Sequence, residues 1–152
     1  MKLGVFMIPL HNPARNLMEV LAEDRDAVIR ADELDMVAIR CGEHVSSITE
    51  PIASSLMFFV SAIAQTKNII IASGAINLPQ QHPSHVTVQG AIFDHMCRGG
   101  YIMGIGTGGL ISDFKFLGLT DETERREMML EAIGAIHIFL SGGLGYDIDG
   151  KY

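Results

Sequence analysis

Residues 69–83, IIIASGAINLPQQHP, carry the pattern that decides the fold. The run 69–76 is apolar almost throughout, which is typical of a parallel strand that is covered on both faces. A loop with four polar residues follows at 77–82, and Pro83 begins a segment with helical character. The stretch therefore predicts a strand, a loop and a helix in succession, which is the repeating unit of an α/β fold.

Three further apolar runs have the same character, at residues 3–8, 36–41 and 101–105. Helix-like segments alternate with the four runs, at about 17–34, from 51 onward, 83–99 and 121–140. The strand starts are roughly 30 residues apart, which is the size of a βαβ unit. Because parallel connections are right-handed, successive units wind in the same direction. We therefore expect four βα units in one parallel sheet.

Local signals set the expected helix ends. Asn16 is expected to cap the first helix. Pro51 is expected in the first turn of the second helix, and Gly99 at the C-terminal end of the third. Acidic residues after Thr120 favour the N-terminus of the fourth helix because they complement the helix dipole.

Two architectures are compatible with four βα units, an open doubly wound sheet and a (β/α)8 TIM barrel. Gly104, Gly106 and Gly109 match the spacing of the dinucleotide-binding motif G-x-G-x-x-G. That motif belongs at the first βα turn and must open directly into a helix. Here it follows the fourth strand, and residues 110–115 do not predict a helix. The bare backbone of this loop would still let a flat or phosphorylated ligand approach closely.

The end of the sequence bears on this choice. Residues 146–152, YDIDGKY, contain Asp-Gly between alternating residues and predict a hairpin. Four units cannot close a barrel, and the sequence stops at Tyr152 within this element. We therefore expect residues 1–152 to be a fragment, the N-terminal half of a single barrel domain.

The composition predicts a soluble protein with a packed core. Hydrophobic residues make up 48% of the 152 residues, and the net charge is −7 with no basic stripe, so nucleic acid is not an expected partner. Cys41 and Cys97 form no CxxC pair, which favours reduced thiols in the cytoplasm. The sequence start lacks the features of a signal peptide. The longest apolar candidate, 51–66, is too short for a membrane span, so no membrane association is expected.

In both architectures, ligands bind at the carboxyl ends of the strands. Glu43 and His44 come directly after the second strand. Histidine exchanges a proton near neutral pH, and a neighbouring carboxylate can orient it. Adjacent residues of an extended chain point to opposite faces, so the two side chains need not touch. Position alone leaves two interpretations open, a proton-transfer site and a partly exposed polar end of a strand.

Other features also have two interpretations each. The small residues 73–75, Ser-Gly-Ala, fit tight barrel packing or leave room for a planar ring. Arg125 and Arg126 fall in the first turns of the fourth helix, either as a solvated surface pair or as a clamp for an anion such as phosphate. The histidines show no spacing with cysteines or carboxylates that is typical of metal ligands, and no metal is expected.

Four stretches, in this order and spacing, make the sequence similar to the bacterial luciferase-like, flavin-dependent monooxygenases. They are GEHVSSITEP at 42–51, TKNIIIASGAINLPQQHP at 66–83, FDHMCRGGYIMGIGTGGLISDFKFLGL at 93–119 and ERREMMLEAI at 124–133. The resemblance covers essentially the whole chain and corresponds to the N-terminal half of the family's barrel. It implies an α/β fold, a TIM barrel of the luciferase-like type, of which about the first four βα units are present.

The resemblance also implies an activity and the residues that perform it. Such an enzyme uses reduced FMN and O2 to oxygenate an apolar organic substrate, and a separate reductase delivers the flavin. His44 matches the family's catalytic histidine beside the flavin, and Glu43 matches a position that lines the same pocket. Gly74 and Ala75 match the end of the third strand, against which the flavin ring packs in the family. Gly106 and Thr107 match the fourth-strand loop beside the flavin, and Arg125 matches a phosphate-contacting arginine. At this end of the third strand the family has a non-prolyl cis peptide.

Three positions depart from the family pattern. Arg40 stands within the second strand, where members often carry an apolar or aromatic residue, and a buried charge is costly unless it is paired. Gly100 replaces a residue that is commonly basic. Thr107 replaces an arginine of the luciferases, which removes a guanidinium from the phosphate site.

The sequence supports three functional hypotheses. The first is an FMN-dependent monooxygenase that acts on an aldehyde or a terpene-like substrate, with His44 assisting proton transfer. The second is a deazaflavin-dependent oxidoreductase of the same superfamily that transfers hydride. The third is a non-catalytic half-barrel that self-associates through its unpaired strand edges. A homo-oligomer is expected, and the substrate is not identified by the sequence.

Overall fold

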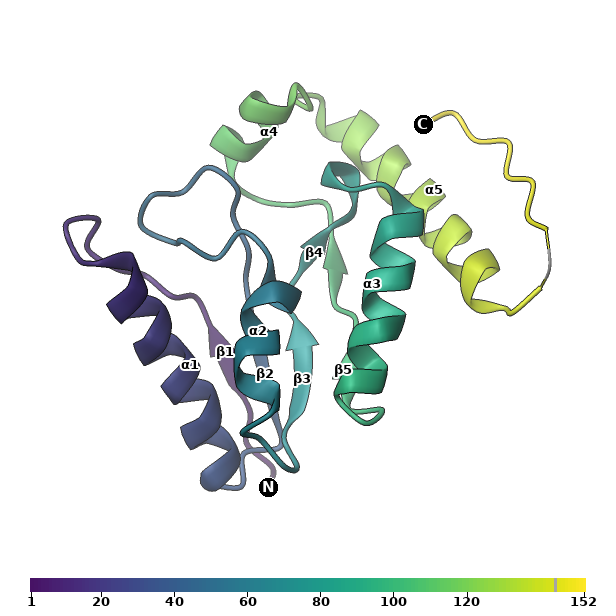
Figure 1. Ribbon diagram of the computed structural model, residues 1–152. Helices are drawn as coiled ribbons and strands as arrows, with labels where there is room; N and C mark the ends of the chain where they lie inside the picture. The colour runs from purple at the N-terminus through teal and green to yellow at the C-terminus, as the bar shows by residue number, and fades with distance from the viewer. Residues whose placement is uncertain (144) are drawn as a thin grey trace.

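The computed structural model describes residues 1–143 and 145–152, and its centre is a parallel four-stranded sheet (Figure 1). The strands of this sheet are, in spatial order, β1 (Val5–Met7), β2 (Ala38–Cys41), β3 (Ile70–Ser73) and β5 (Tyr101–Ile102). A second, two-stranded ladder joins β4 (Ile76–Asn77) and β6 (Ile105–Gly106). The helices are α1 (Leu17–Glu33), α2 (Ser55–Ile63), α3 (Pro83–Met96), α4 (Ile111–Leu117) and α5 (Glu122–Leu140), with a 3-10 helix η1 (Leu78–Gln80) after β4.

The order of the strands decides between the two architectures. In a doubly wound sheet the order reverses at the first strand, so β1 lies inside the sheet. Here β1 is at an edge, and each connection leads to the next strand along the sheet. This winding continues into a closed barrel when more units follow. The prediction of about four βα units of a (β/α)8 barrel is confirmed, and the doubly wound alternative is wrong.

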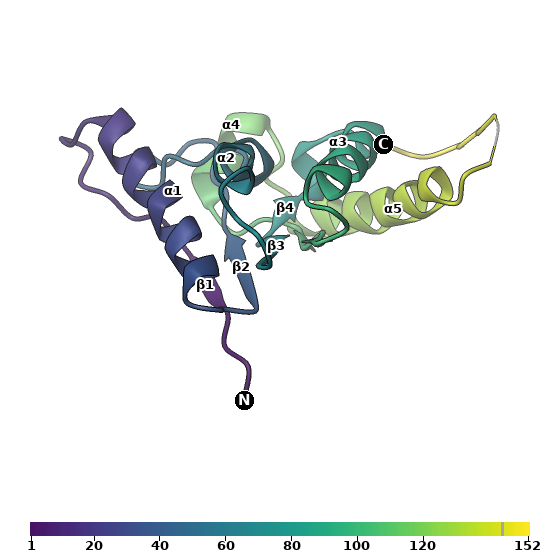
Figure 2. The same ribbon diagram turned by 60° about the horizontal axis from the view of Figure 1, so that its bottom comes forward.

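The outer face of the sheet is covered by helices α1, α2 and α3 (Figure 2). Ile39, Ile71 and Tyr101 lie in register across β2, β3 and β5. They pack with Phe59 of α2 and Phe93 of α3, and the ring centroids of Phe93 and Tyr101 are 5.0 Å apart. Burying an aromatic or large aliphatic side chain of this kind contributes about 1.5–3 kcal/mol. The stability of the sheet therefore comes mainly from this outer layer.

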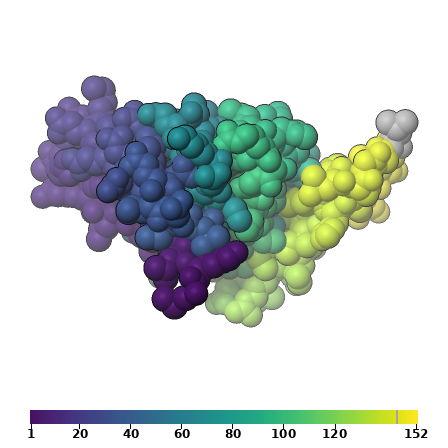
Figure 3. All heavy atoms as spheres, turned by 90° about the horizontal axis from the view of Figure 1, so that it is seen from below, coloured from purple at the N-terminus to yellow at the C-terminus, as the bar shows by residue number. Residues whose placement is uncertain are grey.

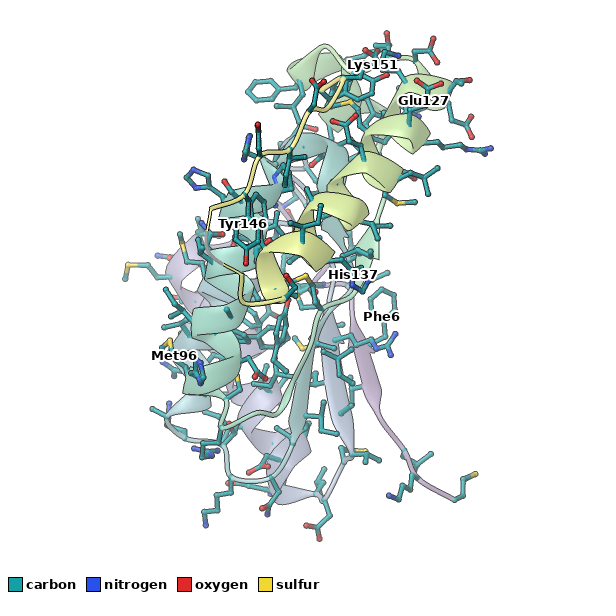
Figure 4. The ribbon with its side chains drawn as sticks, turned by 90° about the vertical axis from the view of Figure 1, so that its right-hand side faces the viewer. Phe6, Met96, Glu127, His137, Tyr146 and Lys151 are labelled. Carbon is teal, nitrogen blue, oxygen red and sulfur yellow. The ribbon has the colours of Figure 1, made fainter. Side chains whose placement is uncertain are left out.

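The inner face of the sheet carries a second row in register, formed by Phe6, Arg40, Ala72 and Ile102. Phe6 is 59% exposed and Ile102 is 46% exposed, and Arg40 is exposed as well. Phe6 points to the side of the sheet away from α3 and its residue Met96 (Figure 4). In a TIM barrel this face is the packed interior. The expected cost of a buried charge at Arg40 is wrong for this chain, because the inner face is open.

The third and fourth predicted strands are each divided in two. Gly74 and Ala75 separate β3 from β4, and Met103 and Gly104 separate β5 from β6. Ser73 connects the two interruptions, because its hydroxyl accepts from the Gly104 amide at 2.9 Å and donates to the Gly104 carbonyl at 2.9 Å. A Cβ at Gly104 would lie 2.1 Å from the Ser73 carbonyl oxygen, so the approach of the two strands requires glycine there.

Two predictions about helices are wrong. Helix α2 begins at Ser55 rather than beside Pro51, because Ser54 is the N-cap and its side chain accepts from the Met57 amide. The absence of a helix over residues 110–115 is also wrong, since α4 begins at Ile111. Its N-cap, Leu110, makes no side-chain hydrogen bond, which explains why the sequence shows no start signal.

The other helix ends are close to those predicted. Asn16 caps α1 by accepting from the Met18 amide, and Asp121 caps α5. Helix α3 begins at Pro83 as predicted but ends at Met96, three residues before Gly99, which has a left-handed φ of 78°. Among the residues described, no helix is both long and apolar enough to cross a lipid bilayer.

The predicted hairpin at residues 146–152 is wrong. These residues form no strand and run beside α5, as Figure 4 shows for Tyr146 and Lys151. The amides of Lys151 and Tyr152 donate to the carboxylate of Glu131, and the Lys151 ammonium pairs with Glu127 at 2.9 Å. Helix α5 and the tail beside it together project from the rest of the molecule (Figure 3).

Candidate active site

A pocket of about 340 Å³ lies at the carboxyl ends of the strands. Six of the seven predicted site residues line it: Glu43, His44, Gly74, Ala75, Gly106 and Thr107. They come from the ends of three neighbouring βα units, which a parallel sheet brings together at one edge. The structure thus unites residues up to 64 positions apart in the sequence, while their chemical roles stay predictions.

Glu43 is fixed against the N-terminus of α2 and is only 6% exposed. Its Oε2 atom accepts from the Ser55 amide at 2.9 Å and from the Ser55 hydroxyl at 3.1 Å. The N-terminus of a helix attracts a carboxylate in this position. Burial nevertheless raises the pKa of Glu43, and the hydrogen bonds from Ser55 offset this effect only in part. Glu43 is therefore easier to protonate than an ordinary surface glutamate.

His44 is held between two carboxylates. Its Nδ1 atom lies 3.2 Å from Oδ2 of Asp113, and its Nε2 atom lies 3.1 Å from Oε2 of Glu50. The backbone amide of His44 donates to the Ile52 carbonyl at 3.0 Å, which fixes the start of the loop. The side chains of His44 and Glu50 are each 25% exposed, so both can be reached from the pocket and from solvent.

Asp113 was missed by sequence reasoning and lies in the first turn of α4. Its side chain is 1% exposed, and its Oδ1 atom accepts from the amide and the hydroxyl of Ser46. Burial by itself would raise the pKa of Asp113, but the hydrogen bonds from Ser46 and His44 outweigh it, and the pKa lies below its usual value. An acidic residue in the first turn of a helix would have been the signal, had the helix been predicted.

The Gly74–Ala75 segment forms one wall of the pocket with bare backbone. The peptide bond between these residues is cis, which is the feature that the family resemblance implies here. A Cβ at Gly74 would lie 3.0 Å from the Phe6 ring and 3.2 Å from Cβ of Arg40. Across the pocket wall, a Cβ at Gly106 would lie 3.4 Å from Cβ of Ala75. A side chain at residue 74 or 106 would meet these neighbours, so glycine keeps this wall free of side chains at both positions.

The loop after β6 is also bare and is supported from behind. Thr107 lines the pocket, and its hydroxyl makes only a long contact of 3.4 Å with the Gly108 carbonyl. Gly108 has a φ of 87°, and a Cβ there would lie 2.8 Å from the Phe114 ring. Phe114 of α4 therefore fixes the path of this loop.

Arg125 does not line the pocket and is not a solvated surface residue. It is 8% exposed, its guanidinium lies 3.7 Å from the centre of the Phe114 ring, and Nη1 donates to the Leu119 carbonyl at 2.8 Å. Its Nε atom is buried and makes no hydrogen bond. The surface-pair interpretation holds only for Arg126, which is 68% exposed and pairs with Glu122. The phosphate role of Arg125 stays a prediction.

The similarity to known proteins extends over the whole chain. The family model described as luciferase-like monooxygenase matches residues 1–152. The chain belongs to this family. The luciferase-like resemblance that the sequence suggests is thereby confirmed.

Named monooxygenases are similar to this luciferase-like chain over most of its length. Limonene 1,2-monooxygenase from Rhodococcus erythropolis is 34% identical over 139 residues, which are 91% of this chain and 36% of that enzyme. 4-Hydroxyprotoasukamycin monooxygenase from Streptomyces nodosus subsp. asukaensis is 30% identical over 139 residues, 91% of this chain and 37% of that enzyme. The chain therefore spans little more than a third of the length of these curated relatives.

A solved structure shows the same fold with a flavin. It is the oxygenating constituent of the 3,6-diketocamphane monooxygenase of Pseudomonas putida, a type II Baeyer–Villiger monooxygenase in complex with FMN. It superimposes with a TM-score of 0.93 at 25% identity, covering 100% of this luciferase-like chain and 42% of the other.

A larger pocket of about 480 Å³ lies elsewhere, between α5, the start of α3 and the tail beside α5. None of the residues at the strand ends that were predicted for the site lines it. Its size reflects the tail that lies across α5, whereas Glu43, whose pKa is raised by burial, lines the smaller pocket. In the described part of the chain, no cluster of histidine, cysteine and carboxylate side chains is arranged to hold a metal ion.

Proposed function

We propose that this chain supplies the N-terminal half of a flavin-dependent monooxygenase that uses reduced FMN and O2 to oxygenate an apolar organic substrate. The observation that carries the proposal is the position of His44 beside the bare Gly74–Ala75 backbone in one strand-end pocket. A proton-exchanging side chain beside a wall of small residues is an arrangement that can serve flavin chemistry. The similarity to named monooxygenases supports the same reaction class.

The residues present fit an FMN ring. The ring would lie against Gly74 and Ala75 on one side, with Gly106 and Thr107 at its edge, and the Phe6 ring borders this space beside Gly74. The chemistry that reduced FMN supplies when bound is the transfer of one oxygen atom from O2 to the substrate. Arg125 is the residue we expect near the phosphate, because its buried Nε atom has no hydrogen-bond partner in the described structure.

His44 is the residue that we expect to hold or move a proton. Its Nε2 atom, near Glu50, is the ring nitrogen on the pocket side that can exchange one. Glu43 lies in the same wall, and burial favours its protonated form.

The substrate is proposed to be apolar and of small or medium size, such as an aldehyde or a terpene. Phe6 and Ile8 also line the pocket, and both are more than half exposed in this chain. Limonene and diketocamphane, which appear in the names of the relatives, are compounds of this kind. A separate flavin reductase, a homo-oligomeric assembly and a cytoplasmic location are further expectations of the same proposal.

The test requires a complete barrel that contains this chain. A fusion of residues 1–143 to the part of limonene 1,2-monooxygenase that follows the matched region would provide one. With reduced FMN and O2, His44→Ala should lower product formation by at least about 100-fold, because general acid–base catalysis typically contributes that much. Flavin affinity should change by no more than about twofold, since the ring contacts are made by other residues.

The matched control is His85→Ala, a histidine exposed on α3 and remote from the pocket. It should leave turnover unchanged. Equal turnover of the His44 variant and the parent would contradict the role of His44. A protein whose absorption spectrum responds to a deazaflavin but not to FMN would favour the hydride-transfer hypothesis instead, and failure to bind either would favour the non-catalytic half-barrel.

A further inference from the structure

The second carboxylate contact of His44, with Asp113, joins two segments that are 69 residues apart in the sequence. Asp113 uses its two oxygens differently. Oδ1 accepts from the Ser46 amide at 2.8 Å and from the Ser46 hydroxyl, whereas Oδ2 lies 3.2 Å from Nδ1 of His44. The carboxylate is therefore oriented by Ser46, and its remaining oxygen faces the imidazole.

The charge state of Asp113 decides which nitrogen of His44 carries the proton. Hydrogen bonds from Ser46 and His44 outweigh burial and lower the pKa of Asp113, so it is ionised near neutral pH. An ionised carboxylate only accepts hydrogen bonds. Glu50 is a second acceptor, 3.1 Å from Nε2, but its side chain is 25% exposed and water can solvate it, whereas the side chain of Asp113 is 1% exposed. In the neutral ring we therefore expect the hydrogen on Nδ1, toward Asp113, and a lone pair on Nε2. That nitrogen faces Glu50 and the pocket.

We propose that Asp113 is the positioning residue of His44: it holds the imidazole with Nδ1–H toward α4 and leaves Nε2 as the atom that exchanges protons with the pocket. This inference rests on the proposed function for its catalytic consequence only. The hydrogen bonds from Ser46 already attach the loop to α4. The contact between Asp113 and His44 is therefore not needed to hold the loop, and it orients the imidazole ring from its buried side.

The direct test is nitrogen-15 NMR of the histidine rings in the 152-residue chain, without flavin. Long-range couplings identify which ring nitrogen is protonated. The wild-type His44 should carry its hydrogen on Nδ1 at a pH where the ring is neutral. A wild-type ring protonated on Nε2 alone would overturn the proposal, whatever any variant shows.

Asp113→Asn gives the sharper prediction. The Ser46 amide and hydroxyl both donate to the Oδ1 position, so the amide oxygen of asparagine should stay there. Its NH2 group then takes the place of Oδ2 and donates to Nδ1 of His44. The proton of the neutral ring should move to Nε2, which reverses the tautomer. Retention of the Nδ1–H form in a folded Asp113→Asn chain would contradict the inference.

Two controls separate positioning from a merely structural role. Asp26→Asn, on the exposed surface of α1, should leave the His44 tautomer unchanged. Ser46→Ala removes the hydroxyl but keeps the backbone donor to Asp113, so the Nδ1–H form should persist. If Asp113 served only to anchor α4, both Asp113→Asn and Ser46→Ala would loosen the helix without reversing the tautomer.

Turnover in the complete barrel separates this inference from the proposed function. Asp113→Asn should lower kcat by at least about 100-fold with little change in KM, because the wrong nitrogen would face the substrate. A reversed tautomer with unchanged turnover would confirm the positioning contact and reject the catalytic role of His44. An unchanged tautomer would reject the positioning role even if the barrel proved to be an active monooxygenase.

Discussion

The two faces of the sheet have opposite surroundings. On the outer face, Ile39 and Ile71 are in register and buried under α2 and α3. On the inner face, Phe6 of β1 is in register with Arg40, the residue after Ile39 in β2, and both side chains are exposed. The same strands therefore have a finished core on one side and an open surface on the other. The fold of this chain depends on the outer layer, whereas the inner face is the side that a complete barrel would enclose.

The candidate site lies where these two sides meet. Glu43 is fixed to α2 of the outer layer, while His44 is fixed to Asp113 of α4 beyond the strand ends. Glu43 and His44 are adjacent in the sequence but are held by two different helices, α2 and α4. Both side chains are thus held by helices even though the inner face is not enclosed.

Phe59→Ala should have the largest effect on stability. Phe59 is completely buried in the outer layer, and truncating such a residue typically costs about 3–5 kcal/mol because it leaves a cavity. Urea unfolding followed by circular dichroism measures the change. A loss below about 1 kcal/mol would show that the outer layer is not the core of this chain.

Glu43→Gln should alter the pH dependence of stability. Because burial raises the pKa of Glu43, the folded state binds its proton more tightly than the unfolded state does. The contribution of this proton to the free energy of unfolding is fully present below the pKa of the unfolded state, about 4.5. It is lost as the pH rises through the pKa of the folded state. The glutamine variant should be more stable at neutral pH, on the order of 1 kcal/mol, and should lack this slope. Unfolding curves between pH 4 and pH 8 that are parallel for the two proteins would contradict this sign.

Phe6→Ala should change stability by less than about 1 kcal/mol. Phe6 is the same residue type as Phe59, but its ring lies on the open inner face. The pair of phenylalanine variants therefore compares the two faces directly in one assay. Equal losses for Phe6→Ala and Phe59→Ala would mean that the inner face is covered in solution, for example by a second copy of the chain.

Arg40→Leu should have the smallest effect on unfolding, within about 0.5 kcal/mol, because an exposed side chain without a partner contributes little. Its effect should be on association instead. An apolar residue between Phe6 and Ile102 would make the inner face a continuous apolar patch, which favours self-association. Analytical ultracentrifugation measures this, with Arg126→Leu on α5 as the control for loss of one exposed charge.

Much of the fold could be predicted because its signals are local. Apolar runs of the right length mark the strands, and Asn16, Pro83 and Asp121 mark the helix starts where the structure has them. The strand-end position of Glu43 and His44 follows from the same pattern, since a parallel sheet gathers these ends at one edge.

The parts that could not be predicted depend on tertiary contacts. Helix α4 has no capping side chain, and Asp113 is held there by Ser46 and His44 from a distant segment. The burial of Arg125 depends on Phe114, which approaches only once α4 is in place. The exposure of Arg40 depends on what covers the inner face, which the sequence of β2 does not encode.

The most direct test of the account is to map FMN binding onto the chain by NMR. Backbone amide shifts of the 152-residue protein are recorded while FMN is added at millimolar concentration. If FMN binds in the strand-end pocket, the shifts should concentrate at the residues that line it, Glu43, His44, Gly74, Ala75, Gly106 and Thr107. Shifts that concentrate instead in the larger pocket between α5 and its tail, or no shifts at residues 74 and 75, would contradict it.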